Sequence, residues 1–111
     1  MSNVDQGMLV KNASALEEAI RGKERVIALI YATWCPYCVS FLPVYRKYAQ
    51  GRDCYLLIED DRWVIADKYD VEVVPTALYF ENGKVVERLD GVLGVGLNEK
   101  QLADFIKAYG L

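Results

Sequence analysis

The sequence contains no histidine, and its 111 residues include only three cysteines. A structural zinc site takes four ligands from cysteine and histidine, so one copy of this chain cannot complete such a site from those residue types. An odd cysteine count also argues against a disulfide framework and favours reactive or buried thiols. The cysteines are therefore the first candidates for chemistry.

The chain also lacks an excess of positive charge and a long hydrophobic run. It has 13 Lys and Arg against 16 Asp and Glu, a net charge of -3, so neither a nucleic acid nor a membrane surface is an expected partner. The longest apolar run, Val26–Ala32, is far shorter than the roughly 20 residues of a membrane helix. Charged residues interrupt the first twenty positions, which is unlike a secretory signal, and we expect a cytoplasmic protein.

Length and composition predict one globular domain over residues 1–111, because a typical domain has roughly 100 to 200 residues. Apolar spacing and capping residues then predict alternating strands and helices. In chain order these are a weak strand at Met8–Val10, a helix from Ser14 to Gly22, a strand at Val26–Tyr31, a helix from beyond Trp34 to about Gln50, a strand at Cys54–Ile58, a short helix after Asp60 or Asp61, strands at Thr76–Phe80 and Val85–Leu89, and a helix capped by Asn98 with Gln101.

This order, β-α-β-α-β-α-β-β-α, predicts an α/β fold with a mixed five-stranded sheet and helices on both faces. Val26–Tyr31 does not alternate with polar residues, which is typical of a strand buried on both faces. Asn82-Gly83 predicts a tight hairpin that makes the last two strands antiparallel.

The segment Trp34-Cys35-Pro36-Tyr37-Cys38 lies between a predicted buried strand and a predicted helix. Two cysteines three positions apart in a first helical turn can close or open a small disulfide with little backbone movement. Pro36 suits the first helical position, which places Cys35 near the N-cap, where free N–H groups and the helix dipole stabilise a thiolate. We therefore predict that Cys35 is the nucleophile. Cys38, one turn further in, is expected to be more buried and to act as the resolving thiol. The alternative, a structural or metal half-site, needs a second chain.

A second feature, Val74-Pro75-Thr76, immediately precedes the apolar run Ala77–Phe80. Proline is poorly tolerated inside a central strand, so a proline at a strand's start marks an edge, a bulge or a cis peptide bond. An ordinary turn proline is the alternative interpretation, and the upstream cysteine motif weighs against it.

Together these motifs resemble the thioredoxin family from about Val26 to Tyr109. The matching segments are Tyr31-Ala32-x-Trp34-Cys35-x-x-Cys38, Pro43 in the following helix, Ala66-x-Lys68-Tyr69-x-Val71-x-x-Val74-Pro75-Thr76 and Phe80-x-Asn82-Gly83-Lys84. The resemblance implies a thioredoxin-like fold and a protein disulfide oxidoreductase without a bound cofactor. It assigns Cys35 the attack on a disulfide and Cys38 the resolution of the mixed disulfide.

The resemblance also implies a binding surface for substrate beside the dithiol. In the family a cis proline, here Pro75, lies next to the cysteines, and the backbone at Val74 pairs with an extended substrate segment. Trp34, Pro75 and Gly91 are expected to border an apolar docking surface, with Pro36 and Tyr37 among the substrate-binding residues. The implied partners are protein disulfides and an electron donor, either a thioredoxin-reductase-type enzyme or glutathione, and we expect a monomer.

Two features depart from the family pattern. Pro36-Tyr37 is the dipeptide found between the cysteines of glutaredoxins, so a glutathione-dependent enzyme is an alternative function. Against it stand the elements before Val26 and the absence of the Gly-Gly and acidic pair that hold glutathione in those proteins. Leu29 replaces the buried Asp that usually moves protons to and from the second cysteine. Glu59 is a candidate substitute, although a solvated carboxylate at a strand end is the favoured interpretation.

A third possible function is a non-catalytic binding module, which two intact cysteines argue against. Three other features receive structural interpretations. Cys54 has no partner at a recognisable spacing and is expected to be a small core residue. Trp63 is expected in the core or at its rim. Asp90–Gly96 is interpreted as a flexible turn, because no Lys-Ser or Lys-Thr follows its glycines as in a phosphate-binding loop.

Overall fold

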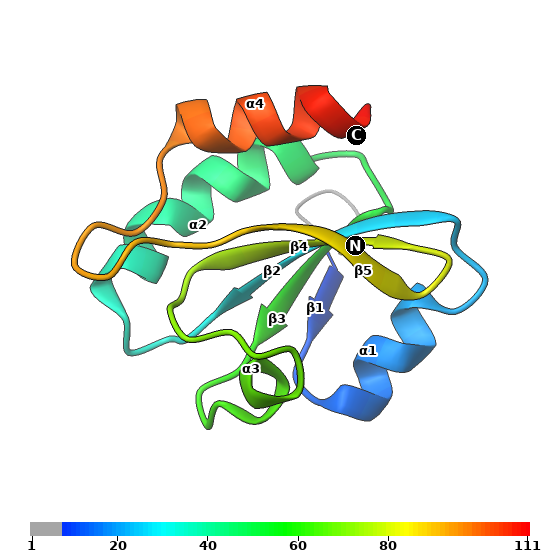
Figure 1. Cartoon of the computed structure of the whole chain (residues 1–111), viewed down its shortest axis with the longest axis horizontal. Helices are drawn as coiled ribbons and strands as arrows, with labels where there is room; N and C mark the ends of the chain where they lie inside the picture. Colours follow the sequence, from blue (N-terminus) through cyan, green and yellow to red (C-terminus); the bar gives the residue numbers. More distant parts are fainter. Residues whose placement is uncertain (1–7) are drawn as a thin grey trace.

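The computed structural model describes residues 8–111, so the first seven positions of the predicted domain lie outside the described residues. The strands are β1 (Met8–Val10), β2 (Arg25–Tyr31), β3 (Tyr55–Glu59), β4 (Thr76–Glu81) and β5 (Lys84–Leu89). The helices are α1 (Ala13–Ile20), α2 (Pro36–Ala49), α3 (Val64–Lys68) and α4 (Glu99–Tyr109). Figure 1 shows the elements in the predicted order, which is confirmed. None of these helices is long and apolar enough to cross a membrane.

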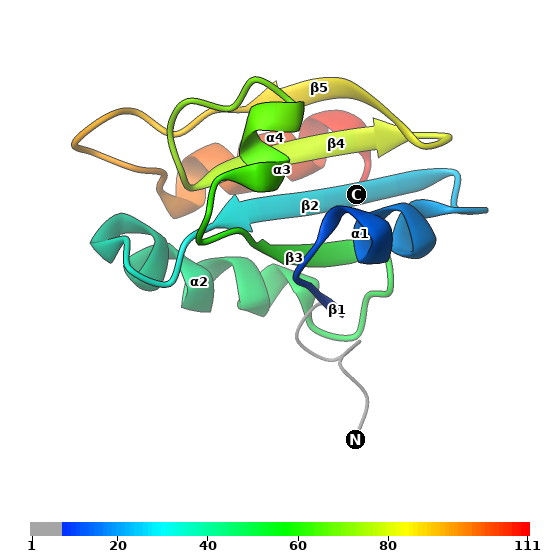
Figure 2. The ribbon, with the colours of Figure 1, turned by 90° about the horizontal axis from the view of Figure 1, so that it is seen from below.

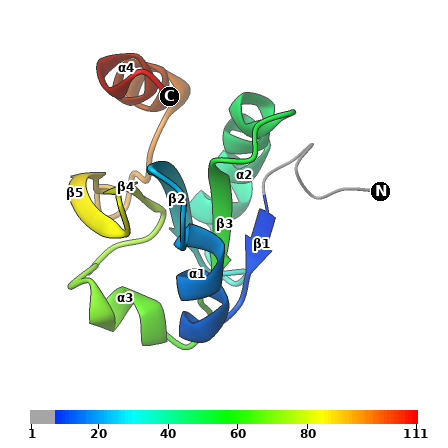
Figure 3. The same ribbon diagram turned by 90° about the vertical axis from the view of Figure 1, so that its right-hand side faces the viewer.

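The five strands form one mixed sheet in the order β1-β3-β2-β4-β5. β1, β3 and β2 are parallel, whereas β4 runs antiparallel to both β2 and β5. Figure 3 shows α1 and α3 on one face of the sheet and α2 and α4 on the other, and Figure 2 shows the same layers from below. The sheet is therefore covered on both faces, as predicted.

β2 is the central strand, and every residue from Val26 to Tyr31 is buried. On α2, Tyr45 is fully buried, and its hydroxyl lies 3.1 Å from the carbonyl oxygen of Ile27 and 2.9 Å from that of Leu56. One side chain thus ties α2 to both β2 and β3. This contact fixes α2 against the sheet, so its first turn lies close to the carboxyl end of β2.

The predicted N-cap of α1 is wrong, whereas the prediction that Gly22 ends the helix is confirmed. Asn12, not Ser14, is the N-cap, and its side chain accepts a hydrogen bond from the Ala15 N–H at 2.7 Å. Asparagine in an extended conformation caps a helix at least as well as serine, so Ser14 lies inside the first turn. The helix ends at Ile20, and Gly22 follows in a turn with a φ of 75°.

The sequence spacing of Cys38, Leu42, Tyr45 and Ala49 predicts one buried stripe along α2, and this prediction is partly wrong. Cys38, Tyr45 and Ala49 are buried as expected, but Phe41 is buried in place of Leu42, which is half-buried. A helix face can be continued by steps of either three or four residues, and spacing alone does not choose between them. The helix does continue through Pro43, as predicted.

The other capping and turn predictions agree with the structure, except at α3. Asn98 and Gln101 form the reciprocal capping box at the start of α4. Asn82 and Gly83 have φ values of 51° and 84°, which suit the tight hairpin between β4 and β5. The N-cap residue of α3 is Trp63, whose side chain makes no capping hydrogen bond. Of the two predicted caps, Asp60 is the one whose carboxylate accepts hydrogen bonds from this helix, from the N–H groups of Val64 and Ala66.

Candidate active site

The two cysteines of the Cys-Pro-Tyr-Cys segment lie at the N-terminus of α2. Cys35 is the N-cap residue and Pro36 follows at the first helical position, as the sequence predicts. The backbone N–H of Cys38 donates a hydrogen bond to the Cys35 sulfur at 3.3 Å. A donor aimed at a sulfur stabilises the negative thiolate more than the neutral thiol, and the helix dipole acts in the same direction.

The two sulfur atoms differ in their environments. Cys35 retains 6% of its surface exposed, whereas Cys38 is fully buried. Burial raises the pKa of the Cys38 thiol to about 12; the backbone hydrogen bond from Ala32 opposes this shift, and the neighbouring Cys35 adds to it. Cys35 also lies 3.8 Å from the carbonyl oxygen of Val74, to which its thiol can donate. At neutral pH Cys38 is therefore a protonated thiol beneath Cys35.

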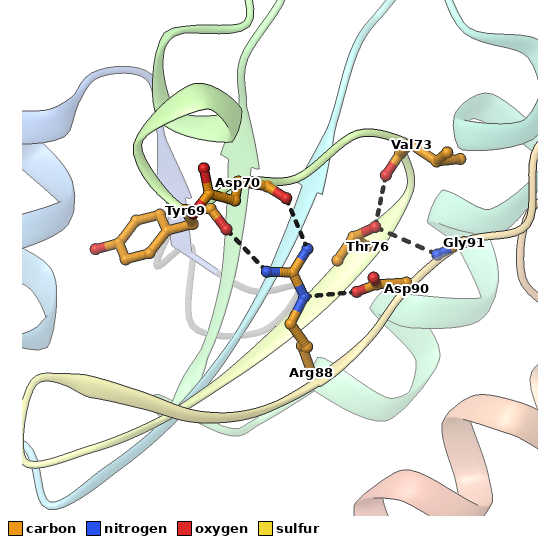
Figure 4. Close-up of polar contacts among 7 residues, drawn as sticks. All are labelled: Tyr69, Asp70, Val73, Thr76, Arg88, Asp90 and Gly91. Atoms are coloured by element: carbon orange, nitrogen blue, oxygen red, sulfur yellow. Dashed lines mark hydrogen bonds and ion pairs between the residues drawn. The ribbon is translucent and has the colours of Figure 1, made fainter.

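The segment before β4 faces the dithiol through Val74. The Val74–Pro75 peptide bond is cis, which is one of the outcomes that the sequence pattern allowed. The Thr76 hydroxyl donates to the carbonyl of Val73 at 2.5 Å and accepts the Gly91 N–H at 3.2 Å (Figure 4). A Cβ atom at Gly91 would lie 2.3 Å from the Pro75 carbonyl oxygen, so only glycine fits this close approach.

Arg88 on β5 holds the preceding loop in place, a role that sequence reasoning missed. Its guanidinium donates to the carbonyls of Tyr69 at 2.8 Å and Asp70 at 3.3 Å, and to the Asp90 carboxylate at 2.7 Å (Figure 4). These contacts tie the α3–β4 loop to the end of β5. An arginine on a hairpin strand carries no signal of this role in the sequence, because its partners are backbone carbonyls of a distant loop.

Two tryptophans form an aromatic pair beside the cysteines. The rings of Trp34 and Trp63 stack with centroids 6.1 Å apart, and the Trp34 indole N–H donates to the Asp61 carbonyl at 3.1 Å. The Thr33 hydroxyl and backbone N–H both donate to the Asp61 carboxylate at 2.7 Å, which lowers the pKa of Asp61. Trp63 is half-buried and packs against the core, so it lies at the rim of the core, one of its two expected positions.

A groove of about 250 Å³ runs beside Cys35. Five of the eight predicted site residues line it, namely Trp34, Cys35, Pro36, Tyr37 and Val74. The other three, Cys38, Pro75 and Gly91, are buried and do not line it. A larger recess of about 630 Å³ near Glu24 and Gly83 contains no cysteine, so size alone does not identify the site.

No carboxylate among the described residues contributes to the pKa shift of Cys38. Leu29 is fully buried on β2 between Leu57 of β3 and Ala77 of β4. Glu59 accepts a hydrogen bond from the Tyr31 hydroxyl at 3.3 Å and pairs with Lys11 at 3.7 Å, as suits a strand-end carboxylate. Within residues 8–111 there is also no cluster of three residues suited to hold a metal ion.

The comparisons with known proteins agree with this geometry. The sequence matches the Thioredoxin family over residues 7–108. It is 36% identical to Thioredoxin-1 of Saccharomyces cerevisiae over 84 residues, which cover 73% of this chain and 82% of that protein. It is also 36% identical to Protein disulfide-isomerase 1 of Caenorhabditis elegans over 93 residues, 78% of this chain but only 19% of that protein.

Among solved structures, a mutant thioredoxin from Halobacterium salinarum NRC-1 superposes with a TM-score of 0.76 at 28% identity, covering 98% of this chain and 95% of that one. A mixed sheet with a cysteine pair at the start of α2 defines the class of thioredoxin-fold proteins with a dithiol. The chain belongs to the thioredoxin family, and its activity is that of a thiol-disulfide oxidoreductase.

Proposed function

We propose that this protein reduces disulfides in other proteins, with Cys35 as nucleophile and Cys38 as resolving thiol. The observation that carries the proposal is the Cys38 N–H donated to the Cys35 sulfur, combined with complete burial of Cys38. The first feature aims an N–H donor at the sulfur that attacks, and the second keeps Cys38 protonated until it is needed.

The reaction consists of two exchanges. The Cys35 thiolate attacks one sulfur of a substrate disulfide, forms a mixed disulfide and releases the other substrate sulfur as a thiolate. Cys38 then loses its proton and attacks the Cys35 sulfur, which breaks the mixed disulfide and releases the second substrate thiolate. Two electrons pass to the substrate, and the protein is left with a Cys35–Cys38 disulfide that a donor must reduce.

The backbone around Val74 is the proposed contact for the substrate segment. Its carbonyl oxygen lies 3.8 Å from the Cys35 sulfur, so a chain that presents a disulfide to Cys35 passes beside it. In the thioredoxin family an extended substrate pairs with the backbone at this position. Trp34 and Tyr37 line the same groove and are 61% and 45% exposed, which leaves their rings available for contact.

A protein reductase is the proposed electron donor, in preference to glutathione. Neither lysine nor arginine is found among the described residues that line the groove, and Glu72 lies there instead. Glutathione carries two carboxylates against one ammonium group, and this lining offers neither carboxylate a cationic partner. A volume of about 250 Å³ is also below the range of roughly 300 to 1,000 Å³ usual for small-molecule sites. Turnover with NADPH and a thioredoxin reductase, compared with turnover with glutathione and its reductase, tests this choice.

A cytoplasmic, monomeric protein is the proposed state in the cell. Free thiols persist in a reducing compartment, and an unpaired third cysteine, Cys54, is compatible with one. Alkylation of thiols in intact cells measures whether the cysteines are reduced there. Sedimentation of the purified protein measures its oligomeric state.

Single cysteine variants test the assigned roles. Cys38→Ser is expected to accumulate a mixed disulfide through Cys35, because attack still occurs and resolution does not. Cys35→Ser is expected to lose both steps, and Cys54→Ser is the matched control that keeps both. Non-reducing mass spectrometry detects the trapped species. A Cys35→Ser protein that reduces disulfides at the wild-type rate would refute the mechanism.

A further inference from the structure

We infer that the groove beside Cys35 selects protein segments with a large apolar side chain next to the disulfide and a lysine or arginine close by. This inference rests on the proposed function, because it names the substrate class of the same site. It depends on two features of the groove lining: an exposed apolar loop and one unpaired carboxylate.

The first feature is the Val92–Gly96 loop between β5 and α4. Its three apolar side chains are mostly exposed: Val92 at 51%, Leu93 at 83% and Val95 at 67%. The loop is nevertheless ordered by backbone hydrogen bonds, because Val92 and Gly96 bond to each other in both directions, at 3.1 and 2.8 Å. The sequence-based interpretation of a flexible turn therefore misses a hydrogen-bonded loop that presents apolar side chains to solvent.

The loop is anchored to the dithiol motif at its base. A Cβ atom at Gly96 would lie 3.0 Å from the Cβ of Tyr37, so the loop backbone packs directly against one of the two residues between the cysteines. Val92 and Leu93 then line the groove together with Trp34. Contiguous exposed apolar side chains mark interaction sites, and these adjoin the proposed nucleophile. A substrate segment bound at Cys35 would cover them.

The second feature is Glu72, which precedes Val73 and Val74 in the chain and lines the groove with them. It is exposed, and it is the one charged residue among the described residues that line the groove. It makes neither an ion pair nor a side-chain hydrogen bond within the described part of the chain. The nearby acidic residues are already engaged: Asp61 with Thr33, and Asp90 with Arg88.

The cations on neighbouring segments do not neutralise Glu72. Arg62 lines a different recess together with Lys11, and the Arg88 guanidinium is held by two carbonyls and Asp90. The carboxylate of Glu72 is therefore free to attract a cationic side chain of a bound segment and to repel an anionic one. Exposed ion pairs change binding equilibria by up to about fivefold, so a measurable preference is expected.

The test uses two peptides that contain the same disulfide flanked by leucine and differ only in a neighbouring lysine or glutamate. Wild-type protein is expected to reduce the lysine peptide with a kcat/KM about two- to fivefold higher, and Glu72→Lys to reverse this preference. Glu24→Lys is the matched control. Glu24 lies just before β2 and Cys35 lies just beyond its other end, so the length of this strand, about 20 Å, separates the control position from the groove. This distance exceeds the electrostatic screening length of about 10 Å at 0.1 M salt.

Leu93→Ser tests the apolar wall separately. It is expected to lower kcat/KM for both peptides by a similar factor, while their ratio stays at the wild-type value. Two results would overturn the inference but not the proposed function. One is an equal wild-type kcat/KM for the two peptides, and the other is an equal change of the kcat/KM ratio in Glu72→Lys and in Glu24→Lys. Failure of the wild-type protein to reduce either peptide or the neutral hydroxyethyl disulfide would overturn the proposed function and the inference with it.

Discussion

The burial of Cys38 has a measurable consequence for stability at alkaline pH. Its thiol has a pKa of about 12 in the folded protein, against a reference value of 9.0. The folded state therefore holds the Cys38 proton more tightly than the unfolded state does. The contribution of the protonated Cys38 thiol to the free energy of unfolding is therefore complete below pH 9 and is lost as the pH rises from 9 to 12.

The size of the effect follows from the pKa difference. Each pH unit above 9 costs about 1.4 kcal/mol, so at pH 10.5 the loss attributable to Cys38 is about 2 kcal/mol. Tyr31, whose pKa is raised to about 12 mainly by burial, also contributes in this range. Cys38→Ala removes the cysteine contribution and leaves that of the tyrosine. The difference between wild type and variant therefore isolates one thiol.

Urea unfolding of the reduced proteins, in half-unit steps from pH 7.5 to 10.5, measures this difference. The gap between the two unfolding free energies is expected to be constant up to about pH 8.5 and then to change by about 2 kcal/mol in favour of Cys38→Ala. A constant gap across the whole range would refute the reasoning, because it would mean that Cys38 ionises equally readily in both states.

The same property bears on resolution of the mixed disulfide. A thiol that titrates far above neutral pH must lose its proton before it attacks, and no carboxylate among the described residues contributes to the pKa of Cys38. Resolution is therefore expected to accelerate with pH well above 8. Single-turnover release of the second substrate thiol, followed from pH 6 to 9.5, measures this dependence.

Three further predictions concern the surroundings of the dithiol. Gly91→Ala would place a Cβ 2.3 Å from the Pro75 carbonyl oxygen, so we expect a loss of about 1 to 3 kcal/mol of stability in urea melts and weaker substrate binding. An unfolding free energy equal to that of the wild type would mean that the segments carrying Gly91 and Pro75 move apart at no cost. Arg88→Ala removes three donated hydrogen bonds and is expected to lower stability by about 1.5 to 3 kcal/mol and to raise KM, with only partial recovery in Arg88→Lys, which lacks the planar fork. Leu29→Asp buries an unpaired carboxyl in the central strand and is expected to cost about 3 to 5 kcal/mol, yet to speed resolution near neutral pH by supplying a base. Unchanged stability and unchanged rate would mean that Leu29 does not lie beneath Cys38.

The features that sequence reasoning predicted well are those determined by neighbouring residues. The unalternating run in β2, the Asn82-Gly83 hairpin and the Asn98 capping box each depend on contacts within a few positions. The place of Cys35 at a helix N-cap is of the same kind, because Pro36 directly follows it. Errors of detail arose where two local choices were nearly equivalent, as with Asn12 and Ser14.

The features that were missed depend on residues far apart in the sequence. Arg88 bonds to Tyr69, 19 positions earlier, and Trp34 stacks on Trp63 from a different loop. Periodicity and capping rules describe one element at a time, so they cannot specify which backbone carbonyl a distant arginine will reach. The residues that line the groove beyond the five predicted ones therefore could not be predicted from the sequence, although the proposed nucleophile was predicted from five consecutive residues.

The contrast between the two cysteines shows how such distant contacts create a chemical difference. Three helical positions correspond to a rotation of about 300°, so Cys35 and Cys38 lie only about 60° apart around α2 and share a face. Their different exposure, 6% against zero, therefore arises from position along the helix and not from its rotation. Tyr45 fixes α2 against β2 and β3, which buries Cys38 one turn in and leaves Cys35 at the open end. Reversing the roles would require attack by a sulfur that no substrate can touch, so the order of the two exchanges follows from how the helix is held on the sheet.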